Sequence, residues 1–367
     1  MFKKLIYNLT KKLFALKENN SRDIGNPESI LVVRQHNQLG DLLACVPLFR
    51  ALKETFPKAR VTVIVSPQNA SAIKKNKYID EYFVFDKKKI YLPSYFNEFL
   101  RLLRQPYDLA VVPVTVSISF TSNLMARLAN AKARIGVRSL NGTLNRYHFL
   151  FDRKVSMDWM RHPDQNVSEF CLEILRPFGI STSDCSSEIT FDSSDTGKAR
   201  QFINSNGLRG KELLIGLHVG AGKPPNRWPL MKYAELIERL NKSYNAGFFL
   251  TGSSADMEEI DYLRKYITVK PSLFLNRTIP EVAALVSEAD LFVTNDTGIM
   301  HVAGTTTTPQ VSIFGPTNPY NWAPVGGNKV FIRKSDIIDE VSVDEVYALC
   351  QKALSEKNRS RTWDLRI

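Results

Sequence analysis

Residues 291–317, LFVTNDTGIMHVAGTTTTPQVSIFGPT, decide the fold of this 367-residue chain. The stretch begins as an apolar strand, turns at residues 295–298, continues as a short helix and ends in a second apolar strand. A strand that passes through a Thr-Gly turn into a helix directs backbone N–H groups and the positive helix end at one spot, which suits an anion and above all phosphate. Open α/β sheets bind their ligands at such carboxyl ends of strands. The second half of the chain is therefore expected to hold a phosphorylated or nucleotide-bearing ligand.

Length and composition set the outer limits. A chain of 367 residues is too long for one ordinary core, so two domains are expected. The net charge of +12 indicates an anionic partner such as nucleic acid, lipid headgroups or acidic sugars, although a merely basic surface would give the same value. Four scattered cysteines without metal-like spacing argue against a disulfide framework or a zinc site and fit a reducing cytoplasm. No apolar run is long enough to cross a bilayer, and no signal peptide is recognisable.

The first nineteen residues predict a basic amphipathic helix. Apolar side chains recur at helical spacing, and lysines occupy the other side, with no acid before Glu18. The apolar residues are Phe2, Leu5, Ile6, Leu9, Leu13 and Leu16. Such a helix suits an anionic membrane surface, and the alternative is an apolar stripe packed on the protein's own body. The polar linker at residues 19–29 makes this helix an appendage to the first domain.

The body alternates strands and helices, which predicts an α/β fold with parallel, doubly wound sheets. In the first half the expected strands are residues 30–34, 61–65, 82–85, 109–112 and 134–137. In the second half they are residues 213–218, 248–251, 273–275, 291–294 and 310–314. We therefore expect a Rossmann-like domain over residues 30–175, a linker over 176–195 and a second Rossmann-like domain over 196–367, with a cleft between the domains.

The loop after the first strand, residues 37–41, ends in Gly40 and Asp41. Asp is a favoured N-cap residue, so Asp41 could simply satisfy the first N–H groups of the following helix. The functional alternative is a carboxylate at the end of a strand that accepts a proton from a hydroxyl group. A single Gly-Asp pair does not decide between the two.

Two loops in the second half carry further candidates. Residues 218–229, HVGAGKPPNRWP, contain small residues, among them Gly220, and the cations Lys223 and Arg227. This loop is neither a Walker A loop nor a G-x-G-x-x-G fingerprint, and a plain glycine-rich turn would look similar. In the opening stretch, Asp296 could cap the helix, Thr297 and Gly298 could donate to phosphate, and His301 lies one turn further on. The sequence contains no Asp-x-Asp pair and no histidine cluster, so it does not indicate a divalent metal site.

Together these motifs resemble glycosyltransferase family 9, whose best-known members are the ADP-heptose:lipopolysaccharide heptosyltransferases. The resemblance runs from about residue 30 to residue 333 and rests on four motifs in register. They are R-x-x-x-x-L-G-D at residues 34–41, G-A-x₅-R-W-P at 220–229, D-T-G-x-x-H at 296–301 and F-G-P-T-x-P-x-x-W-x-P at 314–324.

This resemblance implies the GT-B fold, with the acceptor bound by the first domain and the sugar nucleotide by the second. It implies inverting, metal-independent transfer without a cofactor. Asp41 would be the general base. Thr297, Gly298 and His301 would hold the diphosphate of the donor, and Asp296 would organise their loop. Helix ends and cationic side chains would then stabilise the leaving group.

The chain departs from the family at one place. Many members have Lys just before the Arg/His-Trp-Pro of the second loop, where this chain has Asn226. Lys223 or Arg227 could supply the missing charge. Asp256, four residues after a strand-end glycine, could contact the ribose, and a helix-start aspartate is an equal alternative.

The acceptor side has a basic stretch of its own at residues 127–154, which holds seven Lys or Arg residues and the single acid Asp152. We expect Arg138 and Arg146, together with Gly40, to contact an anionic, lipid-linked core oligosaccharide. A solvated basic face is the alternative, and no pattern of interleaved aromatics indicates nucleic acid.

The sequence thus predicts a cytoplasmic heptosyltransferase of lipopolysaccharide core assembly, peripheral at the inner face of the inner membrane, with ADP-heptose as the expected donor. One alternative is a GT-B transferase with a different sugar nucleotide and glycan acceptor. Another is a non-catalytic sugar-nucleotide-binding protein in which Asp41 is only a helix cap. A nucleotide-sugar epimerase is disfavoured because the residue 40–41 and 314–324 motifs belong elsewhere.

Overall fold

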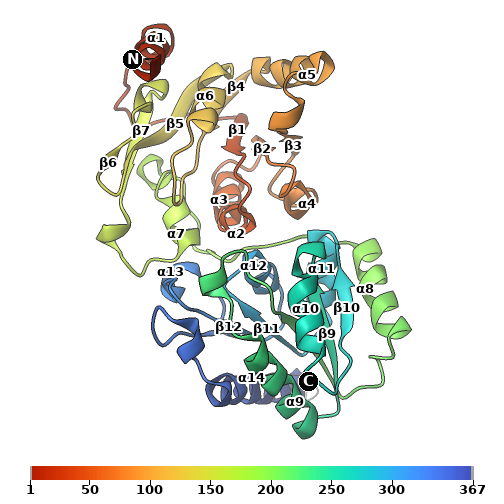
Figure 1. Ribbon diagram of the computed structural model, residues 1–367. Helices are drawn as coiled ribbons and strands as arrows, with labels where there is room; N and C mark the ends of the chain where they lie inside the picture. Colours follow the sequence, from red (N-terminus) through yellow and green to blue (C-terminus); the bar gives the residue numbers. More distant parts are fainter. Residues whose placement is uncertain (1, 365–367) are drawn as a thin grey trace. The chain divides into compact units, whose positions relative to one another are not determined.

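The computed structural model describes residues 2–364, with side chains described for residues 7–356. The chain divides into two compact units, Met1–Cys185 and Ser186–Ile367. Each unit is built around one largely parallel sheet with helices on its faces, as Figure 1 shows. The expected α/β architecture with two Rossmann-like halves is confirmed.

The sheet of the first unit has the strand order β3-β2-β1-β4-β5-β6, with β7 also paired to β5. All pairs are parallel except the short antiparallel pair of β5 with β6. The central strand, SILVVR, is buried over its last five residues, as a strand covered on both faces must be. The strands are β1 (Ser29–Arg34), β2 (Arg60–Val65), β3 (Glu81–Val84), β4 (Tyr107–Val111), β5 (Ala131–Leu140), β6 (Thr143–Leu144) and β7 (Arg153–Met157).

Helices cover both faces of this sheet. The apolar sides of α5 and α6 pack with Leu31, Val33 and Ile64 in one core cluster. The helices of the first unit are α1 (Phe2–Phe14), α2 (Leu39–Leu43), α3 (Val46–Thr55), α4 (Ala70–Ile73), α5 (Pro93–Arg104), α6 (Phe120–Leu128) and α7 (Val167–Leu172).

The sheet of the second unit has the order β10-β9-β8-β11-β12-β13, and every pair is parallel. Gly216 in the central strand is required by packing, because a Cβ there would lie 2.3 Å from the Phe249 ring and 2.7 Å from the Phe292 ring. The strands are β8 (Leu213–His218), β9 (Ala246–Gly252), β10 (Ser272–Leu275), β11 (Leu291–Asn295), β12 (Gln310–Ile313) and β13 (Lys329–Ile332).

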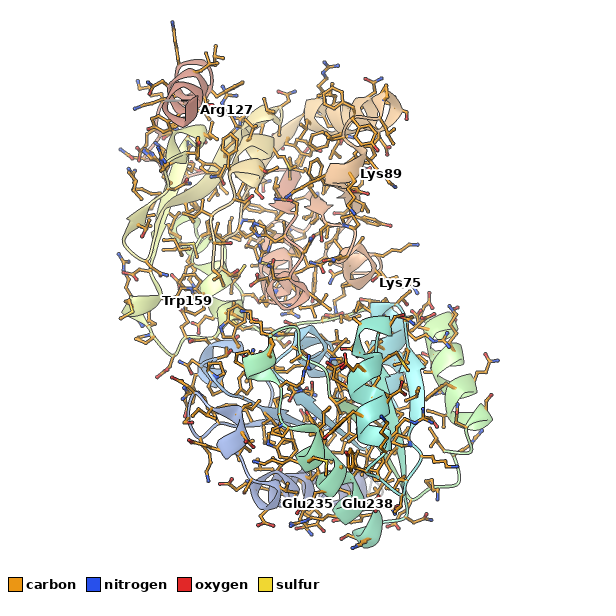
Figure 2. All side chains as sticks on the ribbon, viewed as in Figure 1. Lys75, Lys89, Arg127, Trp159, Glu235 and Glu238 are labelled. Carbon is orange, nitrogen blue, oxygen red and sulfur yellow. The ribbon has the colours of Figure 1, made fainter. Side chains whose placement is uncertain are left out.

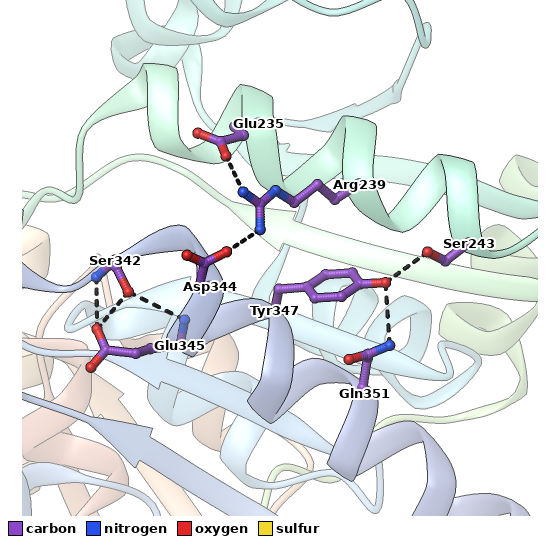
Figure 3. A network of polar contacts seen from close by, with 8 residues as sticks. All are labelled: Glu235, Arg239, Ser243, Ser342, Asp344, Glu345, Tyr347 and Gln351. Atoms are coloured by element: carbon purple, nitrogen blue, oxygen red, sulfur yellow. Dashed lines mark hydrogen bonds and ion pairs between the residues drawn. The ribbon is translucent and has the colours of Figure 1, made fainter.

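One face of this second sheet is covered by α9, α10 and α14, whose apolar sides form a core cluster around Trp228 and Tyr233. The outer edges of α9 and α14 are joined by polar contacts (Figure 3): Arg239 pairs with Glu235 and Asp344, and the Tyr347 hydroxyl lies 2.6 Å from Ser243 Oγ. The helices are α8 (Ser193–Ser205), α9 (Leu230–Ser243), α10 (Met257–Arg264), α11 (Ile279–Ser287), α12 (Gly298–Gly304), α13 (Pro319–Trp322) and α14 (Val343–Asp364).

Over residues 2–364, none of the helices combines the length and the apolar character that crossing a bilayer requires.

Candidate active site

Each sheet has one place where the strand order reverses direction. In the first unit it lies between β1 and β4, and in the second between β8 and β11. The loops that leave two such strands diverge to opposite faces of the sheet and open a crevice, which is the usual ligand site of doubly wound folds. Most of the candidate residues lie at these two points, and Arg138, Arg146 and Asp256 do not.

Asp41 lies in the crevice of the first unit. It is the third residue of α2, and Gln38 occupies the N-cap position. Asp41 Oδ1 accepts a hydrogen bond of 3.0 Å from the Thr115 hydroxyl in the loop after β4, and its Oδ2 lies 3.6 Å from Arg34 Nη2. The carboxylate is therefore held by side chains from β1 and from the loop after β4. It does not cap its own helix, which removes the main structural alternative for this residue. Gly40, beside it, contributes a backbone carbonyl that accepts from Ala44 N within α2.

Arg34 organises this crevice from the end of β1. Its side chain is 2% exposed, and it donates to His36 Nδ1 at 2.7 Å and to the Thr115 hydroxyl at 3.3 Å. Because a guanidinium cannot accept, His36 Nδ1 must be the acceptor and the proton of the neutral ring lies on Nε2. Burial lowers the pKa of His36, and the Arg34 charge lowers it further. His36 is thus a neutral N–H donor near Asp41 at neutral pH.

A cavity of about 550 Å³ adjoins this crevice. It is lined by the residues that follow three neighbouring strands, namely 35–38 after β1, 67–68 after β2 and 85–88 around the end of β3. Lys87 and Lys88 supply exposed positive charge to its rim. The sequence analysis missed both lysines and Thr115. A run of three lysines after a strand would have signalled the lysines, whereas the loop of Thr115 has no recognisable pattern.

The basic stretch at residues 127–154 lies elsewhere in the first unit and contacts the N-terminal segment. Arg138 pairs with Glu18, and the Arg146 guanidinium lies 5.6 Å from the centre of the Tyr7 ring. Arg127, labelled beside α1 in Figure 2, donates to the Phe14 carbonyl at 2.7 Å. Arg138 and Arg146, which we expected at the acceptor site, contact Glu18 and Tyr7 of the N-terminal segment. Neither arginine lines the cavity beside Asp41.

In the second unit, Asn295 joins the two loops at the crevice. Its side-chain amide donates to the Val219 and Gly220 carbonyls at 3.0 and 3.1 Å, and its oxygen accepts from Trp228 N at 3.1 Å. The loop after β8 is thereby fixed to the end of β11. Trp228 is fully buried and belongs to the core.

Asn226 binds the neighbouring Asp296. Its amide donates to Asp296 Oδ2 at 2.8 Å, and a longer contact of 3.5 Å reaches Thr317 Oγ1. This chain therefore uses a neutral donor at position 226 to hold the carboxylate of the 296–301 loop.

The start of α12 follows directly. Thr297 is the N-cap residue, with its hydroxyl accepting from Met300 N at 3.4 Å, and Gly298 is the first helical residue. His301 is one turn along and mostly buried, with its ring edge-on to Trp322 at 6.3 Å. The half-buried first residues of α12 thus lie directly at the end of β11.

The two cations of the loop after β8 differ in availability. Arg227 pairs with Glu259 at 2.5 Å and donates to the Ala221 carbonyl, so its charge is largely matched. Lys223 is exposed and forms no recorded ion pair within the described part of the chain. Lys223 is therefore the cation that a bound anion could recruit.

Asp256 follows β9 and contacts the loop after β8. Its Oδ2 accepts from Ser253 N and Oγ at 2.7 and 2.9 Å, forming a capping box, as the helix-start alternative expected. Its Oδ1 lies against Gly220, where a Cβ would come within 2.2 Å of it. Asp256 thus shapes the loop, and Gly220 is required for that close approach. Within the described residues, no group of three or more His, Cys, Asp or Glu side chains is placed to hold a metal ion.

Solved structures match the fold over most of the chain. A family 9 glycosyl transferase from Veillonella parvula superposes with a TM-score of 0.80 at 20% identity, covering 92% of this chain and all of that one. The Escherichia coli ADP-heptose lps heptosyltransferase II superposes with a TM-score of 0.74 at 20% identity, covering 90% of this chain and 99% of that one. The fold is that of the GT-B glycosyltransferases.

The sequence comparisons define the family. The model of glycosyltransferase family 9 (heptosyltransferase) matches residues 97–346. Lipopolysaccharide heptosyltransferase 3 of Escherichia coli is 23% identical over 301 residues, 79% of this chain and 85% of that protein. Lipooligosaccharide heptosyltransferase 2 of Haemophilus influenzae is 22% identical over 318 residues, 80% of this chain and 86% of that protein. The chain belongs to glycosyltransferase family 9, and it is a glycosyltransferase.

Proposed function

We propose that this glycosyltransferase transfers a heptose from ADP-heptose to an anionic, lipid-linked core oligosaccharide of lipopolysaccharide. The second unit would bind the sugar nucleotide and the first unit the acceptor. The observation that carries the proposal is the Asp41 carboxylate, which Thr115 and Arg34 hold beside a cavity rimmed by Lys87 and Lys88. The relatives named as lipopolysaccharide heptosyltransferases, and the structure of Escherichia coli heptosyltransferase WaaC with ADP, support the choice of donor and acceptor.

The proposed step is a single inverting displacement. Asp41 accepts the proton of the acceptor hydroxyl as the oxygen attacks the anomeric carbon, and the bond from that carbon to the diphosphate oxygen breaks. The electron pair leaves with ADP. The hydrogen bond from Thr115 fixes one carboxylate oxygen and leaves lone pairs on the other for the proton.

The donor diphosphate would be stabilised without a metal ion. The first amides of α12 at Thr297 and Gly298 and the free cation Lys223 are the groups suited to the charge that develops on it. His301 would add one further contact, and Asp296 would keep the loop in place through Asn226. Helix amides and one lysine thus replace the lysine that the family usually has at position 226.

Release of ADP tests this reaction. The protein is incubated with ADP-heptose, a Kdo-lipid acceptor and a chelator, and ADP is measured with time. Asp41→Asn keeps the shape and the hydrogen bond from Thr115 but cannot take a proton, so we expect turnover to fall about a hundredfold or more with little change in ADP affinity. Unchanged turnover by Asp41→Asn would remove Asp41 as the base. Absence of release by the wild type with every nucleotide sugar would favour the non-catalytic alternative, and release only with another sugar nucleotide would favour the other transferase.

We further propose that α1 places the enzyme on an anionic membrane. The helix packs on the first unit through Tyr7, Thr10 and Phe14, with the Tyr7 ring edge-on to Phe149 at 5.7 Å. Leu9 and Leu13, four residues apart, are 55% and 60% exposed on the other side. Exposed lysines lie beside these leucines, and the first turn of α1 holds no acid. An outward apolar pair with cations beside it is the arrangement of an interfacial helix.

Vesicle binding tests this second proposal. Leu9→Ser with Leu13→Ser should weaken binding to phosphatidylglycerol vesicles about tenfold or more, because two leucines lose their burial in the interface. Met231→Ser, which changes a 48% exposed apolar side chain on α9, serves as the control and should bind as the wild type does. Turnover with a soluble acceptor should stay the same. Equal vesicle binding by the leucine variant would show that this face does not meet the membrane.

A further inference from the structure

A second polar cavity, of about 350 Å³, lies at the edge strand β7 of the first unit and plays no part in the function proposed above. Its walls come from the N-terminal segment at residues 18–22, from the β5 and β7 strands, and from residues 177–178. Four cations line it, and the acid among its lining residues is Glu18. The cations are Arg22, Arg138, Arg153 and Lys154.

Glu18 occupies this cavity as an anion. One carboxylate oxygen pairs with Arg138, and the other accepts from Lys154 Nζ at 3.0 Å. The hydrogen bond from Lys154 lowers the pKa of Glu18, and the charges of Lys154 and Arg138 lower it further against the effect of burial. A carboxylate between a lysine and an arginine has the contacts that a phosphate group would make in the same place.

The positive charge exceeds what Glu18 can match. Arg138 and Lys154 both face its single carboxylate, and exposed Arg22 forms no recorded ion pair in the described chain. Arg153 is only 8% exposed, and although its Nη1 pairs with Asp152, its Nε has no hydrogen-bond partner among the described residues. Buried donors of this kind are normally satisfied, so Arg153, which lines the cavity, has an unused donor beside unmatched charge.

The Glu18 side chain can leave the cavity without a change in the backbone that carries it. The backbone on either side is fixed, because Leu16 N donates to the Phe149 carbonyl and Asn19 N to the Asp152 carbonyl, both at 2.8 Å. The Glu18 side chain is about one-third exposed, so it has solvent to turn into. Rotation of one side chain would therefore open the cavity.

We propose that this cavity binds a phosphate monoester and that Glu18 occupies the place of the phosphate in its absence. The phosphate would exchange with Glu18 for Arg138 and Lys154 and would engage the open Nε of Arg153. The same chemistry is found in a soluble phosphate ester, in a phosphate monoester on a lipid-linked glycan and in the headgroup of phosphatidic acid. None of these residues belongs to the Asp41 or α12 groups, so phosphate binding here can be tested separately from the sugar transfer.

The test is phosphate binding by the full-length protein in low salt, measured by calorimetry with inorganic phosphate and with glycerol 3-phosphate in the presence of saturating ADP. Glu18→Gln removes the competing charge, so we expect affinity to rise about tenfold, equivalent to about 1.4 kcal/mol. Arg138→Gln and Lys154→Gln should abolish this gain when combined with Glu18→Gln. The control is Glu288→Gln, which removes a carboxylate paired with Arg200 in the second unit and should leave phosphate affinity unchanged.

A Glu18 that only ties down the N-terminal segment predicts the opposite result. The affinity of Glu18→Gln for inorganic phosphate, for glycerol 3-phosphate and for phosphatidic acid vesicles would then equal or fall below that of the wild type in every case, and this outcome overturns the proposal. Vesicles of phosphatidic acid, tested in the Leu9→Ser, Leu13→Ser background, identify the source of the phosphate. A gain for vesicles alone assigns the cavity to a lipid headgroup, and a gain for glycerol 3-phosphate assigns it to a soluble or glycan-borne phosphate.

Discussion

Asp41 and Arg34 form a buried pair whose partners depend on each other. Their side chains are 12% and 2% exposed, so water screens the two charges little. Breaking a buried pair by removing one partner typically costs 3–5 kcal/mol, because the other charge stays buried without compensation. This pair therefore holds the candidate base in one position.

Replacing Arg34 tests this dependence. We expect Arg34→Met to lower the free energy of unfolding by about 3 kcal/mol, because Asp41 loses its counter-charge. Adding Asp41→Asn to Arg34→Met should recover part of that loss, since the uncompensated charge is then gone. Urea unfolding of the two single variants and the double variant gives the coupling. Strictly additive losses would contradict the pairing.

The sequence predicted these residues unevenly. Asp41 was singled out because a Gly-Asp pair follows an apolar strand, and only the resemblance to family 9 gave it the role of base. Its partner Thr115 is 74 residues away in a loop without pattern. Arg138 and Arg146 were chosen by counting charges along the chain. Their partners are Glu18 and Tyr7, more than a hundred residues earlier, and no local pattern predicts that contact.

At the scale of elements, the strands that the sequence missed are edge or near-edge strands. The ten apolar runs that it predicted are present as β1 to β5 and β8 to β12. The missing ones are β6, β7 and β13, which are short or mix lysine and arginine with apolar residues. Natural edge strands carry charge to prevent pairing with other chains, and the same charge hides the periodicity that identifies a strand.

The helix α1 shows a different limit of periodicity. The spacing of its leucines predicted an apolar side, and the two expectations were a membrane or the protein body as its partner. The helix in fact packs on the body through Tyr7, Thr10 and Phe14, and Leu9 and Leu13 remain outside. The periodicity of an amphipathic sequence does not show which side of the helix faces the domain. In α1 the aromatic side faces the domain and the aliphatic side faces solvent.

The edge strand β13 is fastened to the end of α12 by Lys329. Its Nζ donates to the carbonyls of Ala303, Thr306 and Thr308 at 3.3, 2.7 and 2.5 Å, which satisfies groups that a helix end leaves free. Burial lowers the pKa of Lys329 from 10.5 to about 7. The unfolded chain therefore binds this proton more tightly than the folded protein does.

The pH dependence of stability follows from that difference. The penalty for charging Lys329 in the fold is fully present below pH 7 and vanishes above the unfolded pKa of 10.5. Stability should therefore rise between those limits, by up to about 1.4 kcal/mol per pH unit. Lys329→Met lacks the group, so the difference in unfolding free energy between wild type and variant should change with pH over this range. Parallel profiles from pH 7 to 10 would contradict the burial of a titrating amine.

At the scale of the molecule, the two units repeat one arrangement. In each, the loops after the central strand and after its neighbour across the reversal point are tied by polar side chains: Asp41 with Thr115 in the first, Asn226 with Asp296 in the second. The four family motifs begin at or follow strands β1, β8, β11 and β12 of the two sheets. The repeat also assigns the units different chemistry, because one crevice holds a carboxylate and the other presents helix amides and a free lysine.

This division predicts where ADP acts. If the second unit binds the nucleotide, ADP at a hundred times its Kd should stabilise that unit by about 2.7 kcal/mol against opening and slow amide exchange there. We expect protection at residues 219–229 and 295–301, measured by hydrogen exchange and mass spectrometry, and little change at residues 34–43 and 85–88. Asp41→Asn should show the same protection, because Asp41 acts on the acceptor and not on ADP. Protection concentrated at residues 34–43 would place the nucleotide in the first unit and reverse the assignment. Because ADP alone carries no sugar to transfer, any protection that it gives reports binding and not catalysis.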